Sequence, residues 1–380
     1  MKKQDSCQAS RFNAIALKRF KRRLKSKLKS KQRRRGQSRS NLKNKTDHVK
    51  AKIFGGKGYV ISAPRYISIY EVNDNVNTYV ATMKFVEDIR QNYGKRKCIF
   101  DFSATECFTA ASLVVIYATI EEAYNNGDER GVVLLPKSGR IVKDMIALSN
   151  LRMLIEGKNI TYTLSGDEFL PVITGHGRVH LEEIMDHIQK KIYDDNLTDK
   201  ENAEQEYVYC DAVSETVHNV GAHAYPNRRD EEKKWWVLCH FDVNERQLYL
   251  AIYDSGVGIP KTVVKNPWFT PAYKKQYPIE YKELIKRSGG ETNFLFVKYI
   301  SEAQMVGMSM VGDVTGTKMS KHGQGSKSII ALVKETSDGK LWVFSGRGMY
   351  NAVSNEAAVV CELPETFQGT LVQWNINYHA

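Results

Sequence analysis

Three short blocks, set in a fixed order between residues 215 and 326, constrain the fold of this chain more than any other feature. They are Glu215-Thr-Val-His-Asn219, Asp254-Ser-Gly256-Val-Gly258-Ile-Pro260 and His322-Gly323-Gln-Gly325-Ser326. Each block alone is common in turns or on the solvated face of a helix. Their order, together with the helix, strand, turn and helix patterns around them, predicts one α/β unit that holds all three.

The first block lies on a predicted helix. Residues 211–225 contain no interior proline, and three valines recur there at three- and four-residue spacing, as in a helix with one buried face. Glu215 and Asn219 then lie one turn apart on the same side. A carboxylate and an amide oxygen at this spacing can hold a water and a hard cation, and Mg²⁺ bound to phosphates favours such ligands.

The second block follows the apolar run at residues 248–253, which predicts a buried strand. Asp254 at the strand exit can accept a hydrogen bond from an amino group such as that of adenine. Gly256 and Gly258 allow a tight turn and a close approach to a flat ligand.

The third block places Gly323 and Gly325 directly before a predicted helix that starts at Ser326. A glycine turn that leads into a helix N-terminus offers free amides and the positive end of the helix dipole to a phosphate. Together the three blocks predict a nucleotide pocket.

In these blocks the chain resembles the GHKL ATPases, a family of histidine kinases, anti-sigma-factor serine kinases, and gyrase B-type, chaperone-type and mismatch-repair ATPases. The matching positions are Glu215, Asn219 and His223 for the N box, Asp254, Gly256 and Gly258 for the G1 box, Gly323 and Gly325 for the G2 box, and Gly369 and Thr370 for the closing strand. The match covers residues 200–377. It departs from the family at Ser326, where many members have Leu, and in the length of the segment between the G1 and G2 boxes.

The resemblance implies an α/β sandwich of the Bergerat type, with one mixed sheet covered by helices on one face. It implies that Asn219 ligates Mg²⁺, that Asp254 reads the adenine amino group, and that Glu215 is the general base where hydrolysis occurs. The remaining ATP-binding positions that it implies are Gly256, Gly258, Gly323, Gly325, Ser326 and Thr370.

Residues 58–165 predict a second α/β unit, with strands at 97–102 and 131–136 and helices at 110–126 and 138–148. The run at 101–113 resembles the STAS fold of anti-sigma-factor antagonists, in which a strand ends in Asp-x-Ser and the next helix carries a phosphorylatable Ser. Ala110 and Ala111 occupy the matching positions here, so the phosphoacceptor is missing unless Thr109 or Ser112 substitutes. The pattern favours a role in packing or partner recognition.

The segment 261–322 contains several prolines and glycines and is predicted to be irregular, apart from a short helix within 291–302. Its length and its place between two glycine blocks predict a nucleotide lid. Lys318 or Lys321 could meet the terminal phosphate, or both could be solvated loop charges.

Length and composition favour two domains, because 380 residues with 42% hydrophobic side chains can bury two ordinary cores. The predicted division is a basic leader (1–52), a STAS-like domain (53–170), a linker helix (171–199) and a GHKL-type domain (200–380). The six cysteines are scattered without C-x-x-C pairs, and no apolar run approaches the about 18 residues of a membrane span. We therefore expect a cytoplasmic protein.

The net charge of +13 is concentrated in the leader. Residues 1–52 hold 20 Lys and Arg against two acidic residues, a charge of +18, whereas the rest of the chain carries −5. Such a leader can be a flexible solvated segment, can contact nucleic acid through phosphates, or can attach to an acidic membrane or protein surface as a basic amphipathic helix. Nucleic acid is the preferred partner, because few apolar side chains are present for membrane burial.

Three functions are compatible with these patterns. The chain is an ATPase whose nucleotide state gates an interaction with a protein partner, or an anti-sigma-type serine/threonine kinase that acts on a separate STAS-like substrate, or an ATP-sensing regulator without turnover. The presence of Glu215 favours turnover, and the missing phosphoacceptor disfavours a self-contained kinase. The ATPase is the preferred interpretation.

Overall fold

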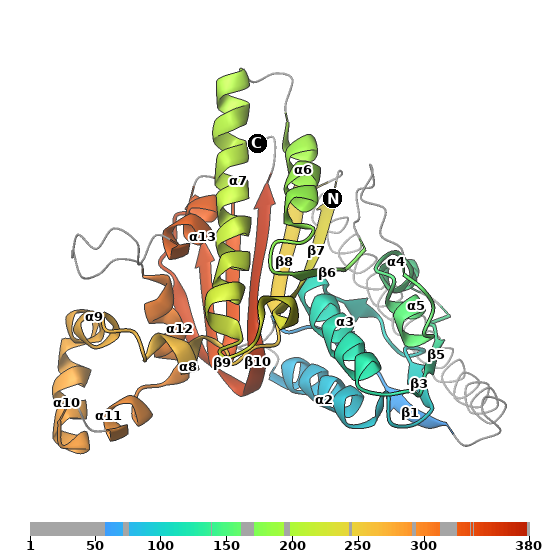
Figure 1. Cartoon of the computed structure of the whole chain (residues 1–380), viewed down its shortest axis with the longest axis horizontal. Coiled ribbons are helices and arrows are strands. Elements are labelled where there is room, and N and C mark those ends of the chain that lie inside the picture. Colours follow the sequence, from blue (N-terminus) through green and yellow to red (C-terminus); the bar gives the residue numbers. More distant parts are fainter. Residues whose placement is uncertain are drawn as a thin grey trace, which may run out of the picture. The chain divides into compact units, whose positions relative to one another are not determined.

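The structure is a computed structural model, and its contacts divide the chain into two units, Met1–Gly58 and Tyr59–Ala380. The described residues are 58–70, 76–137, 139–160, 171–193, 198–242, 245–290, 294–311, 325–334, 336 and 338–377. The leader predicted over residues 1–52 lies outside them. The mixed α/β class is confirmed (Figure 1).

The N-terminal part of the second unit is a small parallel sheet with flanking helices. Strands β1 (Tyr59–Ser62), β3 (Cys98–Asp101) and β5 (Gly131–Leu134) pair in the order β1-β3-β5, and β2 (Tyr66–Ile67) pairs with β4 (Cys107–Phe108). The helices are α2 (Val76–Asn92), α3 (Ala110–Asn125), α4 (Arg140–Leu148) and α5 (Leu151–Ile155). The strands and helices predicted here are confirmed to within two residues at each end.

The C-terminal part contains a five-stranded sheet. Its strands β6 (Ile173–His176), β7 (Lys234–Asp242), β8 (Gln247–Asp254), β9 (Lys340–Val353) and β10 (Val359–Asn377) lie in the order β6-β7-β8-β10-β9. The prediction of a mixed sheet is wrong, because every pairing among these described strands is antiparallel. Short connections join β7 to β8 and β9 to β10, and a short connection reverses the chain direction.

Each face of this sheet packs on helices. Side chains alternate along β7, so Trp235 and Val237 pack with α6 (Leu181–Ile192), α7 (Asp199–Asn219) and α13 (Gly325–Lys334). Figure 1 shows α7 crossing in front of the strands. Trp236 and Leu238 join the core that contains α3. The prediction of helices on one face only is therefore wrong, because α3 of the N-terminal part packs against β7 and β8 on the other.

The segment between β8 and β9 differs most from the prediction. The short helix predicted within 291–302 is α11 (Phe294–Lys298). The rest was expected to be irregular, but it forms α8 (Ile259–Val263), α9 (Phe269–Gln276), α10 (Pro278–Ser288) and α12 (Glu302–Met310). Pro260 and Pro278 lie in the first turns of α8 and α10, where the missing amide hydrogen has no intrahelical acceptor to lose. Phe269, Tyr273 and Phe296 form part of a small core of this segment. Lys318 and Lys321 lie outside the described residues.

The predicted domain boundaries stay predictions, but two observations bear on them. Residues 173–176, placed in a linker by the sequence, form β6 at the edge of the five-stranded sheet. One core cluster joins residues of the small parallel sheet to residues of β7, β8 and β10. Among the described helices, none combines the length and the hydropathy that crossing a bilayer requires.

Candidate functional site

The turn after β8 is docked on the end of α7. The Gly256 amide donates to Asp254 Oδ1 at 2.8 Å, and the Val257 amide donates to the Ala224 carbonyl at 2.8 Å. Ala224 ends a π-helical turn, η2 (Val220–Ala224), that continues α7. A Cβ at Gly256 would lie 2.2 Å from the Ala224 oxygen, so a residue with a side chain does not fit there. The structure thus places the second block against the end of the helical segment that carries the first block.

Asp254 is buried at the strand end, with 5% of its surface exposed. It lies opposite Thr370 of β10 and accepts from the Thr370 amide and hydroxyl as well as from the Gly256 amide. Burial raises the pKa of Asp254 to about 7, although these hydrogen bonds lower it. A buried carboxyl group without a cationic partner among the described residues is costly in the ionised form. Such groups concentrate at functional sites.

Two further residues fix the geometry of this turn. Gly369 has φ of +76°, and a Cβ there would lie 1.8 Å from the Asp254 carbonyl oxygen. The buried Ser345 hydroxyl donates to the Gly369 carbonyl at 2.8 Å and accepts from the Ile259 amide at 2.8 Å. Gly258, with φ of +84°, would meet Ser345 Oγ at 2.8 Å if it carried a Cβ. The sequence did not indicate Ser345, since a single serine within a strand carries no motif.

Glu215 and Asn219 lie on α7 as predicted, one turn apart and partly exposed. Among the described residues, neither side chain has a hydrogen-bond or ion-pair partner. Both oxygens therefore remain available to a ligand, and they suit Mg²⁺ because hard cations prefer carboxylate and amide oxygens. No group of three or more His, Cys, Asp or Glu side chains in the described part of the chain could hold a metal ion. A magnesium site would thus depend on Asn219 and on the phosphates of a nucleotide. His223 lies exposed in η2.

The third block is described only from Gly325, the first residue of α13, because Gly323 lies outside the described residues. Ser326 is partly exposed in the first turn of α13. The helix is held on the sheet by its apolar face and by Trp374, whose indole nitrogen donates to the Ile329 carbonyl at 3.0 Å. Helix α13 also packs on α7, so the first and third blocks lie on neighbouring helices.

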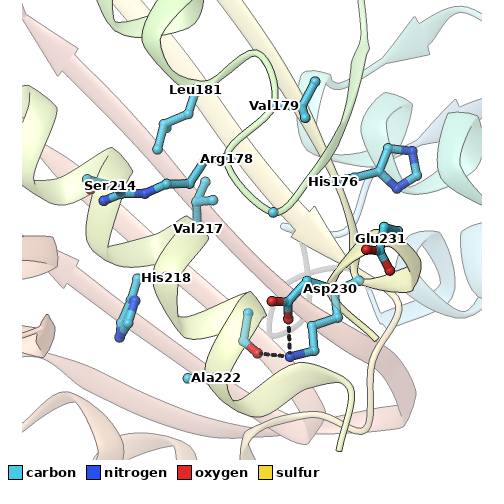
Figure 2. Close-up of a pocket in the computed structure, with 13 residues that line it drawn as sticks. His176, Arg178, Val179, Leu181, Ser214, Val217, His218, Ala222, Asp230 and Glu231 are labelled. Atoms are coloured by element: carbon cyan, nitrogen blue, oxygen red, sulfur yellow. Dashed lines mark hydrogen bonds and ion pairs between the residues drawn. The ribbon is translucent and has the colours of Figure 1, made fainter. Parts of the chain in front are cut away.

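Two of the cavities in the described part of the chain were not indicated by the sequence. The larger, about 800 Å³, lies against α7 and is lined by Ser214, Val217, His218, Gly221, Arg178 and Lys233, among others. Figure 2 shows Arg178 extending toward α7 across this cavity. The smaller, about 650 Å³, is lined by residues at the end of α3 and in the segment 225–234. Neither cavity is lined by Glu215, Asn219 or Asp254.

Helix α3 begins at Ala110, next to both alternative phosphoacceptors that the sequence predicts. Ser112 is fully buried, at 0% exposed, and its hydroxyl lies 2.8 Å from that of Thr109. A kinase could not reach Ser112 without opening the core, and only Thr109 is partly exposed.

Comparisons with known proteins provide no relative for this chain. No protein family that was scanned matches it, and no curated protein matches it. The fold and the contacts of its own residues must therefore carry the functional argument.

Proposed function

We propose that this chain is an Mg-ATP-binding protein, an ATPase whose nucleotide state gates an interaction with a partner protein. The observation that supports this most is the docking of the Asp254–Gly258 turn on the end of α7. It joins a buried, uncompensated carboxyl group, a glycine turn and a helix face with two unpartnered oxygen-bearing side chains. The likeness to GHKL ATPases supports the same function.

Each residue then has a defined role. Asp254 accepts a hydrogen bond from the adenine amino group, with its position fixed by Thr370 and Gly256. Asn219 holds Mg²⁺ through its amide oxygen, and the bound ion would neutralise part of the phosphate charge. Glu215 accepts a proton from the attacking water, the role of a general base. Gly258, Gly323, Gly325 and Ser326 border the nucleotide.

One experiment separates this function from its alternatives. The full-length protein is incubated with Mg²⁺ and ATP labelled at the terminal phosphate, and free phosphate and protein-bound label are both followed. Release of phosphate supports the ATPase. Transfer of the label to an added STAS-like protein supports the anti-sigma-type kinase, and binding without either product supports a sensor.

The basic leader over residues 1–52 is the proposed binding segment for a second partner. The charge of +18 over residues 1–52 favours nucleic acid, because Lys and Arg that neutralise phosphates release counterions. Binding of single- and double-stranded oligonucleotides should then weaken steeply with salt. Binding to anionic liposomes without binding to oligonucleotides would favour a membrane surface instead.

A further inference from the structure

Two adjacent glutamates at the end of α3 reach the five-stranded sheet at different places. Glu121 Oε2 accepts from the Trp236 indole nitrogen and, at 2.7 Å, from the Thr174 hydroxyl. Glu122 Oε1 accepts from the Ser255 hydroxyl. The first contact is to strands β6 and β7, and the second is to the turn after β8. Of these two glutamates, only Glu122 therefore connects the N-terminal part of the unit to the candidate site.

Ser255 is the second residue of the Asp254–Gly258 turn, and it connects to the end of η2. Its amide donates to the Tyr225 hydroxyl at 3.0 Å, and that hydroxyl donates to the Lys234 carbonyl at 2.8 Å. Tyr225 directly follows η2, the continuation of α7. Glu122 thus ends a chain of hydrogen bonds that includes both the turn with Asp254 and the exit of the helix with Asn219.

A cavity of about 650 Å³ lies beside Glu122 and is lined mainly by polar and charged side chains, among them Arg228 and Lys234. Burial raises the pKa of Glu122, while the Ser255 hydroxyl and the cations Arg90, Lys234 and Arg228 lower it. A half-buried carboxyl group is less favourable than an apolar side chain of similar size, so its presence suggests a positional role.

We propose that Glu122 is a positioning residue for the Asp254–Gly258 turn and that, through Ser255, it couples nucleotide binding to α3 and the small parallel sheet. The proposal rests on the proposed ATP-binding function and defines how the N-terminal part would regulate it. When a nucleotide draws the turn toward its base, α3 moves with the turn. A partner that displaces α3 would in turn weaken the nucleotide site, because coupling between two sites is reciprocal.

The neighbouring glutamate provides a matched control. Glu121 and Glu122 lie on the same helix, but Glu121 bonds to strands β6 and β7, whereas Glu122 bonds to the turn. In the full-length protein, Glu122→Ala should weaken Mg-ATP binding about tenfold, the effect of losing one hydrogen bond to a charged group. Glu122→Gln, which keeps an acceptor oxygen, should restore most of the affinity. Glu121→Ala should lower the melting temperature and leave the affinity unchanged.

A double-mutant cycle identifies the contact. Ser255→Ala removes the same hydrogen bond from the other side, so the Glu122→Ala/Ser255→Ala double variant should bind Mg-ATP no more weakly than either single variant. Hydrogen exchange tests the coupling in the opposite direction, from the nucleotide to α3. Mg-ATP should slow exchange of the amides at residues 118–126 in the natural protein, and Ser255→Ala should remove that protection.

Each result decides the proposal. Equal affinity of the natural protein and Glu122→Ala, equal losses in Glu121→Ala and Glu122→Ala, or additive losses in the double variant would overturn it. If Glu122→Ala does not fold, Ser255→Ala and the exchange measurement decide it alone. A natural protein that does not bind Mg-ATP would instead overturn the proposed function, and the positioning role with it.

Discussion

Two neighbouring faces of α7 differ in how they could serve a ligand. One face carries Glu215 and Asn219 and leads, through η2, to the turn at Asp254. The next face, about 100° around the helix, carries Ser214, Val217 and His218 and lines the cavity of about 800 Å³. Glu215 and Asn219 line neither of the two cavities described above, and none of the three residues on the second face is a matched motif position.

The two faces also differ in how tightly their residues are constrained. At the turn, a Cβ added to Gly256 or to Gly369 would lie 2.2 or 1.8 Å from a backbone oxygen, so both positions require glycine. The Asp254 carboxyl group is buried there without a cationic partner among the described residues. In the cavity, Lys233 already bonds to the Gly221 carbonyl at 2.7 Å and to Asp230 at 2.8 Å, and Arg178 is exposed. The residues of the turn are therefore more narrowly constrained by their surroundings than the residues that line the cavity. We therefore propose the turn, and not the cavity, as the nucleotide site.

The largest expected effect tests the motif face directly. Glu215→Gln keeps the shape of the side chain and loses the base, so phosphate release should fall about 10²–10⁴-fold. ATP affinity should change little, because the amide still fills the same space. Steady-state hydrolysis and equilibrium binding, measured on the same preparation, check this. Equal hydrolysis in the variant would remove Glu215 from the mechanism.

The second effect concerns pH and the buried carboxyl group. The pKa of Asp254 is about 7 in the folded chain against an ordinary value of 3.8. The folded state therefore binds more protons than the unfolded state between these values, and stability falls as pH rises from about 4 to about 7. The side chain of the Asp254→Asn variant cannot titrate. The variant should therefore not show this decrease in the free energy of unfolding, which amounts to at most about 4 kcal/mol.

Denaturant unfolding of the natural protein and of Asp254→Asn at pH 4, 6 and 8 measures this effect. The difference in free energy of unfolding should shift in favour of the variant as pH rises. A difference that does not depend on pH would mean that Asp254 is ionised throughout and less buried than the structure indicates.

A third effect concerns the metal. Asn219→Ala removes the amide oxygen that would ligate Mg²⁺, so Mg-ATP binding should weaken by about 1–3 kcal/mol. Binding of ATP in the presence of a chelator should change much less. Calorimetric titration with and without Mg²⁺ distinguishes the two, and equal losses in both conditions would point to a packing role for Asn219.

The smallest effect is expected on the cavity face. Ser214→Trp would fill part of the cavity beside α7, and ATP affinity should stay within about twofold, as for substitutions away from a site. The same titration serves as the check, with Asn219→Ala as the comparison. A loss as large as that of Asn219→Ala would reverse our assignment and place the nucleotide in the cavity.

Much of the fold could be predicted because local patterns agree with it. The apolar run of β8 and the alternation in the N-terminal part specify elements that form within two residues of their expected bounds, and the valines specify α7, which begins twelve residues before the expected start at 211. Of the helices at 259–310, only α11 falls within a predicted helix, and the other four were not predicted. Prolines were read as breakers, although Pro260 and Pro278 lie in first turns, where proline starts a helix.

The candidate site was predictable only where a motif names its residues. Asp254 and Thr370 were both predicted as ATP-binding positions, and the register between β8 and β10 places them opposite each other. Ser345, Tyr225 and Glu122 could not be found, because their roles arise from contacts between segments far apart in the chain. Glu122 and Ser255 are separated by 133 residues, and no local pattern records such a pair.

The most direct test of the central claim is a calorimetric titration of Mg-ATP and Mg-GTP into the full-length protein and its Asp254→Asn variant at pH 8. At this pH the Asp254 carboxyl group is mostly ionised, since its pKa is about 7. We predict saturable binding of one ATP with a clear preference over GTP in the natural protein, and weaker binding with little preference in the variant. No binding of ATP, or equal affinity and preference in both proteins, would contradict the account.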